Sequence, residues 1–244
     1  MGPGPIRGLA PVVAVPSGAY LYELGVVPYG EALAIMQELA AARNQQAIPD
    51  TVMLLEHEPV ITLGSRAVRA EELPLPAEEY ASRGIDVVEV GRGGRSTYHG
   101  PGQLVCYPIL DLGARGRDLR RYVQALEQTA VATLADFGLE GRPLDAAHAS
   151  GVWVEGRKIA SIGVRCARWV TSHGLALNVD LDLGVYDLFD ACGLGNAPFT
   201  SIARETGDAV TTADVRRPLV QRLSEALELE LEPLPAAEGA RALV

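Results

Sequence analysis

The stretch VWVEGRKIASIGVR, from Val152 to Arg165, predicts a β-hairpin. VWV and KIASIGVR are rich in residues that favour strands, and the turn Glu155-Gly156-Arg157 separates them. A further strand is expected from Leu175 to Val179. We therefore expect several neighbouring strands in this half of the chain.

The rest of the chain mixes helices and strands. Apolar residues at helical spacing predict helices at 30–46, 118–137 and 214–229, with Asp118 as the N-cap of the second. Pro218 is tolerated in the last helix only near its first turn. Further strands are predicted at 51–57, just after Pro59, at 85–90 and at 104–110. Because βαβ alternation is not strict, the predicted class is α+β, with a mixed β-sheet flanked by helices.

The length and the chain ends suggest a single domain. We expect one catalytic domain over residues 17–230, a flexible tail at 1–16 and a second tail at 231–244. A smaller C-terminal lobe from about residue 185 is the alternative. The N-terminal tail lacks the layout of a signal peptide, and every apolar run is far shorter than the ~20 residues that span a membrane.

Composition narrows the class of partner and the compartment. The formal net charge of −10 argues against nucleic acid as a general partner. Three cysteines, an odd number, argue against a disulfide framework and favour a reducing cytoplasm. The histidines and cysteines form no ligand-like pairs, so neither a metal nor another cofactor is expected. With no coiled-coil pattern or long apolar edge, we expect a monomer.

Lys158 is the only lysine among 21 basic residues. Arginine replaces lysine wherever a positive charge is sufficient, but it does not release its proton near neutral pH. The single lysine is therefore either a candidate for acid–base chemistry or an ordinary surface residue.

The segment GRGGRSTYHGPGQ, from Gly91 to Gln103, is the richest in glycine and polar residues. Its glycines and proline predict no regular element, and glycine lets a ligand approach the backbone closely. The spacing matches neither a Walker loop nor a dinucleotide fingerprint. We interpret it as a binding loop, with a long turn as the alternative.

Cys192 and His173 are two further candidates. Cys106 and Cys166 lie in apolar strands, whereas Cys192 precedes a glycine in an expected loop. A nearby cation such as Lys158 would stabilise its thiolate, the nucleophilic form. Cys192 is thus either a nucleophile or a structural cysteine. His173 is either a catalytic base or a core histidine, and we favour a structural role in which it shapes the pocket.

Four arginines lie within seven positions, at 115, 117, 120 and 121. They are typical of a solvated face at the start of a helix. That is the interpretation we favour, and a docking patch for an acidic protein is the alternative.

Four segments resemble the lipoyl(octanoyl) transferase family, the octanoyl-acyl-carrier-protein:protein N-octanoyltransferases of lipoate biosynthesis. They are RGGRSTYHGPGQLVCYPILDL, GRKIASIG, HGLALNV and ACG, in the family's order. The resemblance covers about residues 55–202. It implies the fold of the biotin and lipoate protein ligases.

The resemblance also implies a reaction. Family members move an octanoyl group from octanoyl-acyl carrier protein to a lysine of a lipoyl domain. Acceptors are acyltransferase subunits of 2-oxoacid dehydrogenases and the glycine-cleavage carrier protein. Cys192 matches the cysteine that carries the acyl-thioester, and Lys158 matches the lysine that lowers its pKa. The family often has proline where this chain has Ala191, a change that removes no functional group. The residues that match acyl-binding positions are Arg92, Gly93, Gly94, Arg95, Ser96, Thr97, Tyr98, His99, Ser161, Ile162, Gly163, Gly174, Leu175 and Ala176.

An eight-carbon chain needs an apolar pocket, and each buried CH₂ contributes about 0.8 kcal/mol. Ile162, Val164 and Leu175 are candidates for its lining, although all three suit a core equally well.

Three other functions stay open. An ATP-dependent lipoate or biotin ligase would share the fold without needing a nucleophilic cysteine. A non-catalytic module that binds lipoyl domains or acyl carriers would leave Cys192 no more reactive than Cys106 or Cys166. A cysteine hydrolase would replace the acceptor amine with water.

Overall fold

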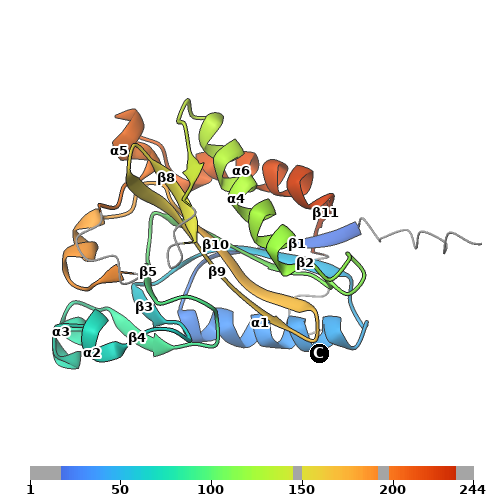
Figure 1. Ribbon diagram of the computed structural model, residues 1–244, viewed down its shortest axis with the longest axis horizontal. Coiled ribbons are helices and arrows are strands. Elements are labelled where there is room, and N and C mark those ends of the chain that lie inside the picture. The colour runs from blue at the N-terminus through green and yellow to red at the C-terminus, as the bar shows by residue number, and fades with distance from the viewer. Residues whose placement is uncertain (1–17, 145–149, 192–197, 235–244) are drawn as a thin grey trace, which may run out of the picture.

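The computed structural model describes residues 18–144, 150–191 and 198–234 (Figure 1). Cys192 lies outside the described residues. Within the described part of the chain, no helix is long and apolar enough to cross a membrane.

The centre of the fold is a mixed sheet of eight strands in the order β11-β1-β2-β6-β10-β9-β8-β7. Its β1–β2 and β1–β11 pairs are parallel and the rest are antiparallel. In that order the strands are Glu230–Pro233, Gly18–Val27, Asp50–His57, Gln103–Ile109, Val170–Asn178, Arg157–Ala167, Gly151–Val154 and Arg142–Pro143. A smaller sheet has the order β4-β3-β5, with strands Asp86–Glu89, Val60–Leu63 and Ser96–His99.

Helices cover both faces of the large sheet (Figure 1). The helix α1 (Tyr29–Asn44) packs on one face through residues such as Met36 and Leu39. The helices α4 (Leu119–Ala135) and α6 (Thr212–Leu227) pack on the other face, around the larger core cluster. The short helices α2 (Arg69–Glu72) and α3 (Ala77–Ser82) lie beside the small sheet. A 3-10 helix at Leu183–Asp187 and the helix α5 (Ile202–Thr206) follow β10 in the chain.

The structure confirms the predicted α+β class with a mixed sheet and flanking helices. The predicted hairpin is β8–β9, and β10 begins five residues before the expected strand start at Leu175. Asp118 caps α4 as expected, since its side chain accepts a hydrogen bond from the Arg121 N–H.

Two local expectations were wrong, and one strand was not predicted. The Gly91–Gln103 segment is not wholly irregular, because Ser96–His99 forms β5 and pairs with β3. Pro218 lies inside α6, beyond its first turn, although we expected it only near the helix start. The strand β1 was not predicted, because Gly18 and Gly25 interrupt its apolar pattern and long-range pairing with β2 and β11 holds it. Since β11 extends to Pro233, regular structure also continues past residue 230.

Candidate active site

A cavity of about 280 Å³ lies between the glycine-rich segment and the β9–β10 hairpin. It contains Lys158 and most of the predicted acyl-binding residues. Those that line it are Arg92, Gly93, Gly94, Arg95, Thr97, His99, Ser161, Ile162, Gly163, Gly174, Leu175 and Ala176. Ser96 and Tyr98 do not line it.

A β-bulge aims Lys158 into this cavity. Val152 pairs with Ala160 and Trp153 pairs with Lys158, so Ile159 is an extra residue in β9. Both Ile159 and Ala160 therefore face the core, where they are fully or almost fully buried. The bulge shifts the alternation of side chains, and Lys158 and Ser161 share the cavity side.

Lys158 is 1% exposed, which removes the interpretation of an ordinary surface lysine. Its Nζ lies 5.9 Å from the centre of the Trp153 ring, within range of a cation–π contact. Its backbone N–H donates to the Pro198 carbonyl at 2.9 Å, and its carbonyl accepts from the Thr200 N–H at 2.9 Å. The sole lysine is therefore held beside the segment that directly follows residues 192–197.

The two described cysteines do not suit nucleophilic chemistry. Burial raises the pKa of the fully buried Cys106 thiol to about 12. Partial burial also raises the pKa of Cys166. Both therefore persist as thiols at neutral pH.

The glycine-rich segment is fixed over β9 by backbone contacts. Gly93 donates its N–H to the Val164 carbonyl at 2.8 Å. A Cβ on Gly163 would lie 3.1 Å from Arg92 Cδ and 3.2 Å from the Gly93 carbonyl oxygen. The guanidinium of Arg92 donates to the carbonyl and the hydroxyl of Thr62, which ties the segment to β3. Glycine at 163 thus permits the close approach that forms this wall of the cavity.

The two-residue period of β5 explains why Ser96 and Tyr98 face away. The Ser96 hydroxyl donates to the Asp190 carbonyl at 3.0 Å, and its N–H donates to Glu72 Oε2 at 2.7 Å. Tyr98 packs in the core beneath the small sheet. Thr97 and His99 point into the cavity. Because we predicted an irregular loop here, the alternation of side chains between the two faces of a strand was not expected.

A hydrogen-bond chain connects His99 to the main chain of Lys158. Gln103 Nε2 donates to Asn178 Oδ1 at 2.9 Å, and Asn178 Nδ2 donates to the Thr200 carbonyl at 3.0 Å. Gln103 Oε1 must then accept from His99 Nδ1–H, at 2.6 Å, so Nε2 of His99 is the bare nitrogen. Thr200 completes the chain through its N–H, which donates to the Lys158 carbonyl.

The histidines around the cavity are kept neutral. Burial lowers the pKa of His57 to about 4, and burial with the nearby Arg92 and Arg165 charges lowers that of His173 to about 3. Burial also holds the pKa of His99 well below its usual range. His57 Nε2 lies 2.9 Å from the Tyr107 hydroxyl. Neutral imidazoles fit a pocket for an uncharged chain.

Several residues that line the cavity belong to no sequence pattern that would predict a place in the site. Tyr107 follows a buried cysteine in β6, and helical periodicity alone does not reveal that Leu119 and Val123 reach a cavity. Val164 was considered only as a candidate for the apolar lining. The lining residues that the sequence did not single out are Arg66, Tyr107, Leu119, Val123 and Ser150. His173, expected to shape the pocket, and Val164, a candidate for its lining, both line the cavity.

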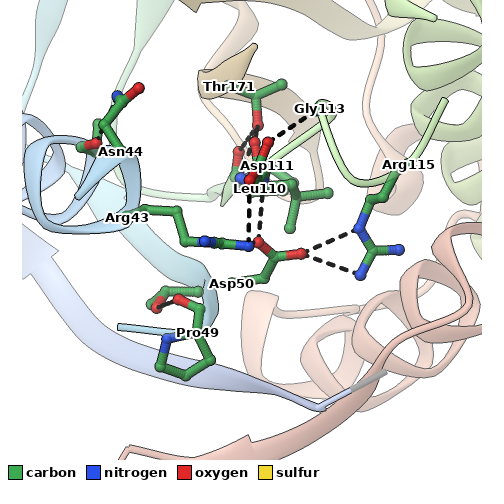
Figure 2. Close-up of polar contacts among 12 residues, drawn as sticks. Arg43, Asn44, Pro49, Asp50, Leu110, Asp111, Gly113, Arg115 and Thr171 are labelled. Atoms are coloured by element: carbon green, nitrogen blue, oxygen red, sulfur yellow. Dashed lines mark hydrogen bonds and ion pairs between the residues drawn. The ribbon is translucent and has the colours of Figure 1, made fainter. Parts of the chain in front are cut away.

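The arginine cluster divides into two parts. Arg115 is a structural residue: its guanidinium pairs with Asp50 at 3.0 Å, and Arg43 binds the same carboxylate at 2.7 Å (Figure 2). The Arg117 guanidinium lies 5.9 Å from the Trp169 ring centre, while Arg120 and Arg121 are exposed. The exposed arginines flank Leu119, which lines the cavity and is 37% exposed.

Solved structures share this fold at low sequence identity. A lipoate-protein ligase A bound with ATP matches with a TM-score of 0.71 and 16% identity, over 93% of this chain and 92% of that one. A bipartite lipoate protein ligase with its E2 lipoyl domain, from Thermoplasma acidophilum, matches with a TM-score of 0.72 and 17% identity, over 93% and 90%. Biotin protein ligase from Aquifex aeolicus matches at 0.55 and 13%, over 86% and 70%.

Relatives in sequence are more similar. An octanoyltransferase of Chloroflexus aurantiacus is 46% identical over 213 residues, covering 86% of this chain and 94% of its own. An octanoyltransferase of Geobacter metallireducens is 43% identical over 218 residues, covering 89% and 98%. Residues 28–224 match the lipoyl protein ligase A/B catalytic domain. The chain therefore belongs to the lipoyl protein ligase A/B catalytic-domain family and, within it, to the octanoyltransferases, which are acyltransferases.

Proposed function

We propose that this enzyme transfers octanoyl groups from acyl carrier protein to lipoyl domains through a thioester on Cys192, with Lys158 as the proton carrier. The observation that carries the proposal is the buried Lys158 side chain in the cavity. Its main chain bonds to Pro198 and Thr200, and the chain from Ala191 to Pro198 contains Cys192.

In the first half-reaction the Cys192 thiolate attacks the carbonyl carbon of the octanoyl thioester. The tetrahedral intermediate collapses when its bond to the carrier sulfur breaks. The Lys158 ammonium gives that sulfur a proton, and the carrier leaves as a thiol. The octanoyl group is then a thioester of Cys192, and Lys158 is a neutral amine.

In the second half-reaction a lysine amine of the acceptor attacks the thioester carbonyl. The amine transfers a proton to Lys158, the bond to Cys192 sulfur breaks, and an amide forms. The Cys192 thiolate and the Lys158 ammonium are regenerated. Arginine at 158 could stabilise the thiolate but could not accept this proton.

The walls of the cavity support an aliphatic substrate. Ile162, Val164 and Leu175 line it together with Leu119 and Val123 from α4. At about 0.8 kcal/mol for each CH₂, burial of the octanoyl chain contributes several kcal/mol to binding. A lipoyl domain as acceptor is in keeping with the Thermoplasma ligase, whose structure was determined with its E2 lipoyl domain.

Intact-protein mass spectrometry after mixing with octanoyl-acyl carrier protein, in the absence of acceptor, tests the thioester. The wild type, Cys166→Ser and Cys106→Ser should each gain one octanoyl group that hydroxylamine removes, and Cys192→Ser should gain none. Equal labelling of all four proteins would contradict the assignment of Cys192.

The fate of the acyl-enzyme separates the alternatives. Addition of a lipoyl domain should discharge the octanoyl group onto one of its lysines. Discharge to free octanoate alone would identify a hydrolase. Transfer that requires ATP and free octanoate would identify a ligase.

A further inference from the structure

A second cavity, of about 360 Å³, shares the lining residue His173 with the first one. It is formed by α1, the end of β4 and the β9–β10 hairpin. Its apolar lining includes Leu33, Met36, Ala40, Val90 and Val170, and exposed residues of α1 stand at its rim. Among the described residues, His173 is the one that lines both cavities.

The backbone of His173 turns its ring into this position. His173 has a φ of 58°, in the left-handed region that few residues other than glycine adopt, although histidine does so more readily than most. Its N–H donates to Met36 Sδ at 3.1 Å, which ties it to α1. The ring stands edge-on to Tyr107, with centroids 5.8 Å apart.

His173 is 3% exposed. Neither nitrogen of its ring has a hydrogen-bond partner among the described residues. An unsatisfied buried polar atom costs about 1–3 kcal/mol. Because its pKa is lowered to about 3, the ring is neutral.

Strand geometry gives an expected distance from the level of Ser161 to the level of His173. Along β9 the cavity runs from Lys158 and Ser161 to Val164, and His173 pairs directly with Val164. Three residues from Ser161 to Val164 span roughly 10 Å at ~3.3 Å each. An extended eight-carbon acyl chain, built from ~1.5 Å bonds, is about 9 Å long. A carbonyl held at the level of Ser161, beside Lys158, thus places the terminal methyl group at His173.

We propose that His173 is the wall that limits the acyl chain to about eight carbons, and that the cavity behind it holds the tail of longer chains once the ring is removed. The inference rests on the proposed function. A chain longer than octanoyl must press on the ring or displace it into a packed site, and both cost free energy. Beyond the wall, Leu33, Met36 and Val170 offer apolar contacts to a methylene tail. Polar and charged side chains line the rest of that cavity, among them Gln37, Arg165 and Arg168.

The test compares acyl carrier protein loaded with chains of eight, ten, twelve and fourteen carbons as donors for wild type and variants. His173→Gly removes the ring and suits the positive φ. It should raise the ratio of twelve-carbon to eight-carbon acyl-enzyme formation by about tenfold or more, equivalent to lifting a steric cost of ~1.4 kcal/mol. His173→Asn, which also tolerates positive φ, should give an intermediate change and carries the test if the glycine variant does not fold.

Ala40→Phe provides the matched control, since Ala40 lines only the second cavity. Alone, it should leave the wild-type chain-length profile unchanged. Combined with His173→Gly, it should fill the second cavity and abolish the gain for long chains. A folded His173→Gly or His173→Asn enzyme with the wild-type profile would overturn the inference, as would a gain that persists in the double variant.

A binding measurement separates this inference from the proposed function. Thermal shifts with octanoate and dodecanoate need no chemistry. If dodecanoate raises the melting temperature of His173→Gly more than that of the wild type, the two-cavity inference is supported. If in addition no acyl-enzyme ever forms, the proposed thioester route is refuted while the inference stands. Equal shifts for both variants and wild type would refute the inference alone.

Discussion

Lys158 and Pro198 are joined by a 2.9 Å hydrogen bond from the Lys158 N–H to the Pro198 carbonyl. A second backbone bond runs the opposite way, from the Thr200 N–H to the Lys158 carbonyl. Lys158 and Phe199 thus form a parallel β-bridge beside β9. The position of the only lysine is therefore coupled to the segment that follows Cys192 in the chain. The proposed proton transfer needs donor and acceptor atoms within about 3 Å of each other, and this backbone pairing would help to hold Lys158 in place for it.

Replacement of Lys158 should separate its two roles. Lys158→Met keeps a similar volume in this buried site and should lower the rate of acyl-enzyme formation by about 10²-fold or more. Lys158→Arg keeps the charge, so it should retain more acylation than the methionine variant yet fail in transfer to the lipoyl domain. Single-turnover measurements of each half-reaction, with circular dichroism as the control for folding, distinguish these outcomes. Arginine that supports normal transfer would exclude the proton-carrier role.

Asn178 should act as a positioning residue through the chain from His99 to Thr200. Asn178→Leu removes the partner of the Thr200 carbonyl and one of the two hydrogen bonds that Gln103 Nε2 donates, the other going to the Tyr98 carbonyl. The loss should cost about 1–3 kcal/mol of stability. The rate of acylation at saturating donor should fall, while the KM for the donor should change less. Asn178→Asp retains the acceptor and should rescue part of the rate. A loss of stability with an unchanged rate would leave Asn178 a structural role only.

The site was predictable from the sequence where its residues belong to local motifs. The glycine-rich segment, the β9 residues from Ser161 to Gly163 and the β10 residues from Gly174 to Ala176 all meet at one cavity. The hairpin and the main helices follow from patterns that extend over a few turns or a few strand residues. Each of these patterns lies within one short segment, so each predicts the structure of that segment only.

The remainder depends on pairing between distant segments. The bulge at Ile159 exists only in the register of β9 against β8, yet it decides where Lys158 points. The β5 alternation that removes Ser96 and Tyr98 from the cavity follows from pairing with β3. His57 and Tyr107 come together across the β2–β6 ladder, which no periodicity encodes. The register between strands that are distant in the sequence therefore decides which of these side chains reach the cavity.

Arg117 and Arg120 should affect the donor only when it is a protein. They flank Leu119 at the cavity, where an acidic carrier would bring its acyl chain. The double charge reversal Arg117→Glu/Arg120→Glu should raise the KM for octanoyl-acyl carrier protein about tenfold and weaken its salt dependence. Octanoyl-pantetheine, which lacks the protein, should react at the wild-type rate. Arg83→Glu, at an exposed site on the edge of α3, is the matched control. An unchanged KM and salt dependence would rule out this docking surface.

Asp50 should be important for stability. Its buried carboxylate binds both Arg43 and Arg115 and accepts from the Asp111 N–H, so it joins α1, β2 and the segment before α4 (Figure 2). Asp50→Asn removes the carboxylate charge that two largely buried guanidinium groups share, with Arg43 keeping only a 3.6 Å pair with Asp111. It should lower the free energy of unfolding by about 3 kcal/mol. Urea denaturation measures this change. Glu140→Gln, which breaks the exposed pair with Arg142, should cost less than about 1 kcal/mol. Equal effects of the two substitutions would contradict the importance of the Asp50 cluster.

Acid should destabilise the fold through its buried histidines. The pKa of His57 is lowered to about 4 in the folded protein, against about 6.5 when unfolded. The unfolded chain therefore binds more protons between these values. The stabilising contribution of neutral His57 is complete above pH ~6.5 and is lost as pH falls toward ~4, at up to ~1.4 kcal/mol per pH unit. His57→Gln cannot titrate and should flatten the dependence of the urea-derived unfolding free energy between pH 7 and pH 5, by roughly one proton's slope. If wild type and variant lose stability in parallel over that range, His57 is not the group that titrates.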